Sequence, residues 1–343
     1  MTTAQATETE LAAATQAGDA DAFALLAERF RAQLQLHCYR MLGSREDAED
    51  LVQETLLRAW SKRATYAGRS TFRAWLYGIA TNACIDILRQ RSKRVLPPDI
   101  AAAADPAVPP QPAADLPWLE PYPDTLLDQA AAELEPESAA ITRETTELAF
   151  LAAIQHLPPR QRAVLILRDV MDWPAKQVAS ALETTVASVN SALQRAHATM
   201  AGHLPASDHA SRSARSVTEH ERALLDGMIA AWERADASAL AALLHEDARL
   251  VMPPTPSWYD GRAAIAAFFV GYAFGPNSAG RFRALPTAAN RQPALAVYMS
   301  APGGGERKPF ALIVLRVTGQ AIAEMTLFGK PGLFRPWGLP AAL

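Results

Sequence analysis

The sequence predicts a multidomain protein in which two all-α domains precede one α+β domain. Apolar residues recur at helical spacing over residues 21–95 and again over residues 141–204. Between these segments, residues 96–140 are acidic and rich in proline. After a short polar segment at 205–217, helical stretches lead into a run of stretches in which apolar and polar residues alternate. Helices followed by antiparallel strands are typical of an α+β domain, which we place at 218–343.

Length and composition limit the class of protein. A chain of 343 residues is too long for one ordinary domain, and residues 1–20 are interpreted as an N-terminal tail. Half of the residues are hydrophobic and a fifth are charged, as in globular proteins. No apolar run approaches the roughly 18 residues of a membrane span, and no signal peptide is evident, so we expect no membrane insertion. The two cysteines, Cys38 and Cys84, are interpreted as buried free thiols. We expect a cytoplasmic location, no metal and no cofactor.

The net charge of -3 hides a strong division along the chain. Residues 55–94 contain nine Lys/Arg and one acidic residue, whereas residues 95–148 contain eleven Asp/Glu and one arginine. Ten of the 25 prolines also fall in the second window. A basic segment is typical of a nucleic-acid-binding surface, and an acidic, proline-rich segment without a core of its own is typical of a linker.

The first all-α domain is predicted from three amphipathic stretches. Ser44 is a good N-cap for the second helix, whose exposed side is acidic and suits a basic partner. The third stretch carries aromatic residues among arginines, a composition that suits single-stranded DNA, because bases stack on rings while cations follow the phosphates. Trp60 and Trp75 are alternatively core anchors, and the basic cluster at 89–94 is alternatively a solvated helix end.

Two segments carry a family resemblance. Residues 47–55 (DAEDLVQET) and 72–82 (FRAWLYGIATN), with Ala59-Trp60 between them, resemble region 2 of bacterial RNA polymerase sigma factors, and most closely the small extracytoplasmic-function group. The resemblance implies that residues on the acidic helix dock on the β′ clamp of core RNA polymerase: Asp47, Asp50, Gln53 and Glu54. It implies that a further set reads the promoter −10 element: Arg69, Phe72, Arg73, Trp75, Tyr77, Asn82, Arg89 and Arg91. The loop 66–71 resembles the family loop that captures a flipped-out base.

The second all-α domain has the layout of a helix-turn-helix. Pro158 and Pro159 begin a helix, Pro174 begins a shorter one, and a turn at 183–185 leads to a longer helix over 186–200. This segment resembles sigma region 4, which implies contacts with the −35 element and with the polymerase β flap. The residues expected to face DNA are Lys176, Thr185, Ser188, Asn190, Ser191, Gln194 and Arg195. We also expect Arg160 and Arg162 on the phosphate backbone.

The C-terminal domain is predicted from two helices near 224–244, a strand at 248–252, a helix at 263–269 and strands near 281–288, 293–300, 309–317 and 321–328, with a turn at 245–247. Its pattern resembles SnoaL-like domains of the polyketide-cyclase and ketosteroid-isomerase superfamily, whose cone-shaped fold can enclose a pocket. The residues considered for such a pocket are Trp232, Met252, Trp258, Tyr298 and Glu324. A sigma factor with this ending resembles a known subgroup, and Trp118, Leu119 and Tyr122 resemble a regulatory motif in its linker.

These observations predict a transcription initiation factor that binds core RNA polymerase and reads promoter −10 and −35 elements, with the C-terminal domain regulating it in cis. The alternative is a bifunctional protein whose last domain binds a small molecule or acts as an isomerase- or cyclase-like enzyme. An anti-sigma factor or a small ligand is left open as a further partner. The charge division adds the hypothesis that linker acids Asp115, Glu120 and Asp124 lie against the basic segment in the absence of DNA.

Overall fold

The computed structural model describes residues 7–68, 70–131, 145–203, 218–275 and 277–343. The chain divides into two compact units. We call Met1–Lys93 with Leu126–Pro205 the helical unit, and Arg94–Thr125 with Ala206–Leu343 the sheet unit. No helix in the described ranges is both long enough and apolar enough to cross a membrane.

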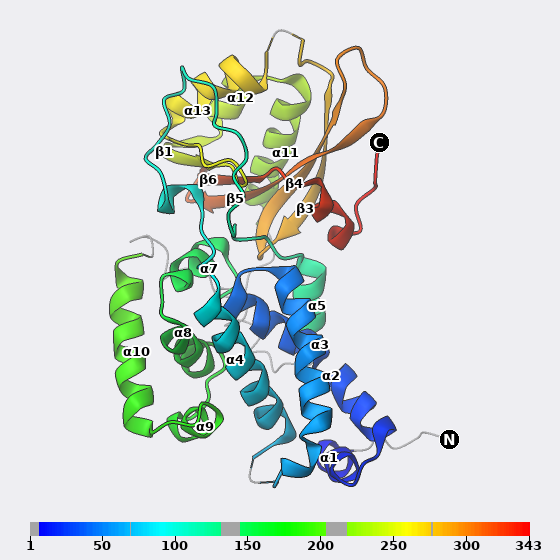
Figure 1. Cartoon of the computed structure of the whole chain (residues 1–343). Helices are drawn as coiled ribbons and strands as arrows, with labels where there is room; N and C mark the ends of the chain where they lie inside the picture. The colour runs from blue at the N-terminus through cyan, green and yellow to red at the C-terminus, as the bar shows by residue number, and fades with distance from the viewer. Residues whose placement is uncertain (1–6, 69, 132–144, 204–217, 276) are drawn as a thin grey trace. The chain divides into compact units, whose positions relative to one another are not determined.

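The first part of the helical unit is a helical bundle (Figure 1). Local capping sets the ends of its helices. The side chains of Asp19, Ser44 and Thr71 each accept a hydrogen bond from a backbone N–H in the first turn of the helix that follows. Gly43 takes a left-handed conformation that ends the second helix, so the third can turn back against it. The elements of the bundle are α1 (Glu8–Gln16), α2 (Ala20–Leu42), α3 (Arg45–Ser61), the 3₁₀ turn η1 (Arg63–Thr65) and α4 (Phe72–Gln90).

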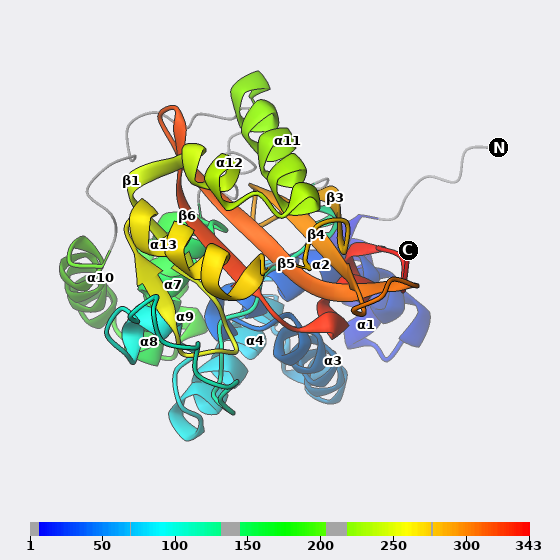
Figure 2. The ribbon, with the colours of Figure 1, turned by 90° about the horizontal axis from the view of Figure 1, so that it is seen from above.

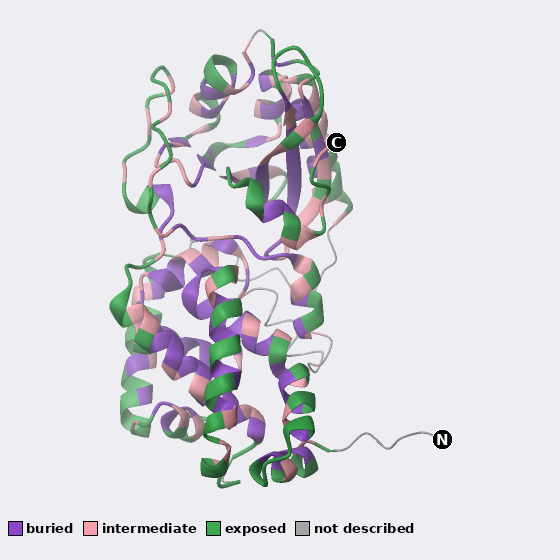
Figure 3. Cartoon of the chain, turned by 45° about the vertical axis from the view of Figure 1, so that its right-hand side comes forward, coloured by how far each residue is buried: buried purple, intermediate pink, exposed green. Residues whose placement is uncertain are grey.

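The second part of the helical unit confirms the predicted order of short helix, turn and longer helix. Pro158 and Pro174 precede the first residues of α8 and α9, and the Thr185 hydroxyl caps α10. Figure 3 shows buried residues along one side of the helices and exposed residues along the other. The elements are α5 (Asp124–Ala131), which begins in the sheet unit, then α7 (Leu148–Gln155), α8 (Pro159–Leu165), the π turn η3 (Ile166–Val170), α9 (Ala175–Ala181) and α10 (Val186–Ala201).

A buried arginine joins the two parts of the helical unit. Arg162 of α8 is 2% exposed and donates to the Met41 carbonyl at the end of α2 at 2.5 Å. Its other guanidinium hydrogen bonds go to the side chain and carbonyl of Gln155 and to the carbonyl of Leu157. Burial lowers the pKa of Arg162 to about 10, so the group remains a cation at neutral pH. The prediction that Arg162 contacts DNA phosphates is therefore wrong in this arrangement.

The sheet unit is an α+β domain, as predicted. Its six strands lie in the order β2-β1-β6-β5-β4-β3, in which β1 and β6 are parallel and the other neighbours antiparallel. Figure 2 shows α11, α12 and α13 on one face of this sheet. The elements are η2 (Pro97–Asp99), α11 (Glu219–Arg234), α12 (Ala237–Ala242), β1 (Leu244–Val251), β2 (Trp258–Asp260), α13 (Arg262–Phe268), the π turn η4 (Phe269–Ala273), β3 (Phe282–Ala289), β4 (Gln292–Ser300), β5 (Arg307–Thr318), β6 (Ala321–Phe328) and η5 (Pro331–Trp337).

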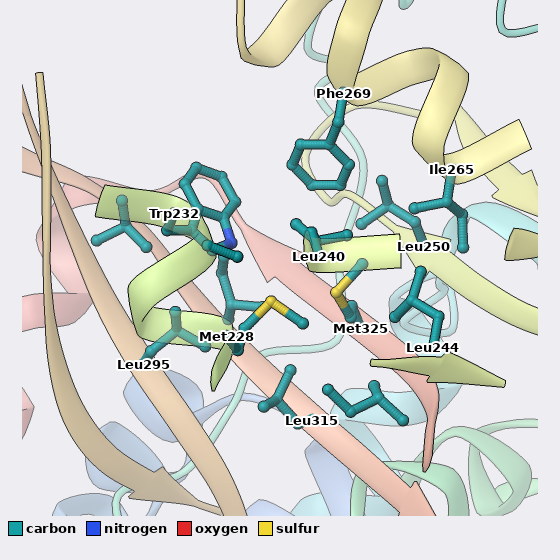
Figure 4. Close-up of a cluster of buried hydrophobic side chains, with 14 of the residues drawn as sticks. Met228, Trp232, Leu240, Leu244, Leu250, Ile265, Phe269, Leu295, Leu315 and Met325 are labelled. Carbon is teal, nitrogen blue, oxygen red and sulfur yellow. The ribbon is translucent and has the colours of Figure 1, made fainter. Parts of the chain in front are cut away.

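The core of the sheet unit lies between these helices and the sheet. Trp232 of α11 is 1% exposed and packs edge-on against Phe269, Phe274 and Phe282, with ring centroids 5.1–5.5 Å apart. Figure 4 shows Trp232 and Phe269 among the aliphatic side chains of this cluster. The expected turn at 245–247 is wrong, because those residues already belong to β1, whose outer positions are exposed and polar.

Replacing Arg162 with alanine should lower the free energy of unfolding of the helical unit by about 3 kcal/mol or more, because it leaves buried carbonyl oxygens without donors. Arg160→Ala is the matched control, since Arg160 is exposed and two residues away; its effect should stay within about 0.5 kcal/mol. Urea unfolding followed by circular dichroism measures both. Equal stability of the two variants would contradict the assigned role of Arg162.

Candidate nucleic-acid and partner surfaces

Helix α3 presents an acidic, exposed side. Asp50, Gln53 and Glu54 are exposed and lie three or four residues apart, so they share one side of the helix. Leu57 extends this side and is 72% exposed, which makes the surface partly apolar. Two of the four predicted carboxylate and amide side chains are in ion pairs: Glu54 pairs with Arg58 at 2.5 Å, and Asp47, which is only partly exposed, pairs with Arg91 at 2.9 Å.

Two aromatic residues predicted to contact the −10 element are in the core instead. Phe72 is 1% exposed and Tyr77 is 2% exposed. Tyr77 packs against His37 and against Trp173 of the helix-turn-helix, and Arg73 lies over its ring at 5.5 Å. Because neither ring is open to a base, we correct these two assignments: the residues hold the bundle together.

The loop between η1 and α4 is held by an aromatic cluster. Tyr66 lies 5.5 Å from both Phe72 and Trp75, and its hydroxyl donates to the Ser70 carbonyl at 2.9 Å across the loop. Trp75 is only half-buried, so its ring packs in the cluster and still reaches the surface. Arg69 lies outside the described residues.

A groove of about 890 Å³ gathers several of the predicted DNA contacts. Trp75 and Asn82 line one side of it, and Lys176 of α9 lines the other. Arg58 and Lys62 line it too, although they were not singled out from the sequence; their only signal was membership of the basic segment. Arg89 and Arg91 are exposed and paired with Asp86 and Asp47.

Helix α4 contacts α9 directly. The Asn82 side chain donates to the Ala181 carbonyl at 3.0 Å. One turn earlier in α4, Gly78 faces the same residue, and a Cβ on Gly78 would lie 3.5 Å from the Ala181 carbonyl oxygen. The predicted −10-reading helix thus packs against the first helix of the predicted −35 reader.

Helix α10 has one buried side and one polar, exposed side. Val189, Ala192, Ala196 and Met200 are buried. All seven residues predicted to face the −35 element are exposed: Lys176, Thr185, Ser188, Asn190, Ser191, Gln194 and Arg195. A shallow groove of about 200 Å³ brings Arg195 and Ser188 together with Arg160 of α8. This arrangement puts two cations and short hydroxyls on one surface, as phosphate and base-edge contacts require.

The predicted linker residues are buried, and Tyr122 is bonded to the C-terminal domain. Trp118, Leu119 and Tyr122 are 8%, 1% and 1% exposed. The Tyr122 N–H donates to the Asn290 side chain at 2.8 Å, and the Asn290 N–H donates to the Tyr122 carbonyl at 2.9 Å.

Earlier in the linker, backbone hydrogen bonds tie Ala104 to Trp258 and Ala114 to Pro254. The Trp258 indole donates to the carbonyl of Ala101. Between Ala101 and Asp124, the linker thus follows the surface of the C-terminal domain.

Two linker acids pair within the sheet unit. Glu120 pairs with Lys330 at 2.8 Å, and Asp124 accepts from the backbone of Arg291 at 2.9 Å. The hypothesis that these carboxylates lie against the basic segment is corrected by these partners, while Asp115 is exposed.

The five residues considered for a pocket have different surroundings. Trp232 and Met252 belong to the hydrophobic core. Trp258 faces the linker, the Tyr298 hydroxyl donates to the Pro340 carbonyl, and Glu324 pairs with Arg316 at 3.4 Å.

The cysteine prediction is confirmed, because Cys38 and Cys84 are buried free thiols. Among the residues that the structure describes, no group of three or more His, Cys, Asp or Glu could hold a metal ion.

Comparisons with known proteins fit this geometry. Family models match in three places: Sigma-70 region 2 at residues 26–94, Sigma-70 region 4 at 147–200 and the SnoaL-like domain at 225–325. The ECF RNA polymerase sigma factor SigG of Mycobacterium tuberculosis is 41% identical over 322 residues, which cover 94% of this chain and 85% of that protein. SigW of Bacillus subtilis is 29% identical over 178 residues, which cover 52% of this chain and 86% of that protein.

A solved structure shares the fold. The crystal structure of the Mycobacterium tuberculosis extracytoplasmic function sigma factor SigJ aligns with a TM-score of 0.59 and 20% identity, over 92% of this chain and 98% of that one. The SigG similarity extends through both sigma regions and the C-terminal domain. This chain therefore belongs to the ECF RNA polymerase sigma factors, and it carries a SnoaL-like domain after region 4.

Proposed function

We propose that the chain binds core RNA polymerase in the bacterial cytoplasm and directs it to specific promoters. The observation that carries this proposal is α10, which buries its apolar side and exposes the predicted −35-reading residues that it carries, from Ser188 to Arg195. The helix-turn-helix follows, in the same unit, a bundle whose α4 carries the predicted −10 residues. The curated relatives are named as RNA polymerase sigma factors, which supports polymerase as the partner.

The surfaces have separate roles in this proposal. The acidic side of α3, with exposed Leu57, docks on the β′ clamp, where opposite charge orients the encounter and the leucine buries apolar area. The helix-turn-helix additionally contacts the β flap. The −10 element binds in the groove lined by Trp75, Asn82 and the basic side chains of Arg58 and Lys62. One half-buried aromatic ring, one amide and two cations suit single-stranded DNA.

Promoter geometry requires the helical unit to open. Elements centred near −10 and −35 lie about 25 base pairs apart, or about 85 Å along B-form DNA. In the structure, however, α4 and α9 are in hydrogen-bond contact through Asn82 and Ala181. One chain cannot place both readers on their elements in this arrangement, so α9 leaves α4 when the promoter is bound.

Run-off transcription with purified core polymerase tests the function. The chain should give defined 5′ ends on a pool of genomic fragments, and core polymerase alone should not. Arg195→Ala should weaken binding of the −35 fragment and reduce the slope of log affinity against log salt by about 1, because one phosphate contact is lost. The matched control is His197→Ala, since this exposed side chain of α10 pairs with Asp169. Random 5′ ends, or an unchanged salt slope for Arg195→Ala, would contradict the proposal.

We further propose that the SnoaL-like domain regulates initiation in cis through the linker. The linker connects the two DNA readers in sequence, and its second half is held by paired hydrogen bonds between Tyr122 and Asn290. Holding these residues on the domain shortens the free chain between the readers, which limits how far they separate. The alternative of an isomerase- or cyclase-like site is not supported by the residues predicted for it. Trp258, Tyr298 and Glu324 contact the linker, Pro340 and Arg316, respectively.

Asn290 gives a specific test of linker docking. Asn290→Gly keeps the left-handed backbone, which has φ 56°, but removes the side-chain acceptor of the Tyr122 N–H, whereas Asn290→Ala removes it and also strains the backbone. Thermolysin should cleave both variants faster than the parent chain near Ile100, Val108 and Leu116, which are exposed apolar linker residues. Transcription output should differ from that of the parent chain in both variants, and more in Asn290→Ala than in Asn290→Gly. Cleavage and output equal to the parent in both variants would contradict docking through Asn290.

A further inference from the structure

We propose that helix α1 positions the base-capturing loop 66–71, with Gln16 and Glu8 as the positioning residues. This inference rests on the proposed reading of the −10 element. The region 2 model matches residues 26–94, so α1 lies before the matched part of the chain.

Gln16 holds the start of the loop. Its side-chain amide donates to the Tyr66 carbonyl at 2.7 Å, across 50 residues of sequence. Tyr66 is the residue whose ring packs on Phe72 and Trp75 and whose hydroxyl crosses the loop to Ser70. The hydrogen bond from Gln16 therefore fixes the backbone of Tyr66, whose side chain makes the contacts that hold the loop.

Glu8 holds the end of the loop. Its carboxylate accepts a hydrogen bond from the backbone N–H of Arg73 at 3.3 Å. This N–H lies in the first turn of α4, where backbone N–H groups have no acceptor within the helix. The neighbouring free donor, on Ala74, is satisfied by Thr71 from within the loop. Burial raises the pKa of Tyr66 and the Glu8 carboxylate raises it further, consistent with this carboxylate lying beside the aromatic cluster.

Helix α1 is itself firmly placed. A reciprocal capping box between Thr7 and Glu10 fixes its start. Leu11, Ala12 and Thr15 are buried on its inner side. At its end, Gly18 has φ 102° and lets the chain turn directly into α2, which Asp19 caps. One helix thus holds Tyr66 and Arg73, on either side of the loop, which lowers the conformational entropy lost when a base binds there.

The test uses the full chain bound to core polymerase. A fork-junction DNA pool with a randomised single-stranded −10 region is selected on the parent holoenzyme. An abasic site is then placed at each position of the selected strand. Gln16→Ala should weaken binding of the intact DNA about two- to tenfold, as loss of one hydrogen bond implies. That loss should disappear with the abasic site at the captured position only and persist at the others.

Thr9→Ala is the matched control, because Thr9 is exposed on the same helix; its binding should stay within about twofold of the parent, as for other neutral surface changes. Gln16→Glu removes the donor while keeping the side-chain length, and it should reproduce Gln16→Ala. If the Gln16→Ala loss is the same with every abasic DNA, or equals that of Thr9→Ala, the positioning role is overturned. If the parent holoenzyme selects no sequence at all, the proposed −10 reading fails instead.

Discussion

The helical unit depends on one buried guanidinium. Arg162 lies in α8, yet it donates to the last turn of α2 as well as to Gln155 and Leu157 of its own subdomain. The partners of this buried cation are carbonyl and amide oxygens rather than a carboxylate. Because these hydrogen bonds require a particular geometry, they specify how the two subdomains meet. Only the Met41 bond crosses between them. Separation therefore leaves the internal bonds of Arg162 in place and exposes one carbonyl to water.

This division of bonds explains how one chain can be compact and still read DNA at distant positions. The contacts across the joint include hydrogen bonds of Arg162 with Met41, Asn82 with Ala181 and Arg40 with Thr145, and the ring contact of Tyr77 with Trp173. In the proposed opening, Asn82 serves both arrangements, because the amide that now donates to Ala181 becomes free for a base when α9 leaves. In the same proposal, the linker, which is bonded to Asn290 of the SnoaL-like domain, limits the length of chain available for that opening. Compactness and promoter reading thus compete for the same residues.

The sequence predicted the order of elements closely, because capping residues and apolar spacing are local signals. Ser44 and Thr185 cap the helices as their positions indicate, and the strands near 293–300 and 321–328 match β4 and β6. Site residues were harder to predict. An aromatic ring at helical spacing suits a core as well as a stacked base, so Phe72 and Tyr77 could not be told apart from Trp75. Arg162 and Arg160 differ only in the direction that they face. The docking of the first part of the linker could not be predicted, because backbone hydrogen bonds such as that between Ala114 and Pro254 do not depend on which side chains are present.

The proposed separation of the two DNA-reading parts is tested most directly by measuring the distance between α4 and α10 in the free chain and on promoter DNA. Spin labels at Gln90→Cys and Ala198→Cys suit this purpose, because both positions are exposed and the native thiols are buried. A pair at Glu28→Cys and Gln90→Cys within the first bundle serves as the control. In the holoenzyme on promoter DNA, the first distance should lengthen by roughly tens of ångströms, as the promoter spacing requires, and the control distance should not. An unchanged first distance in a transcribing complex would contradict the account.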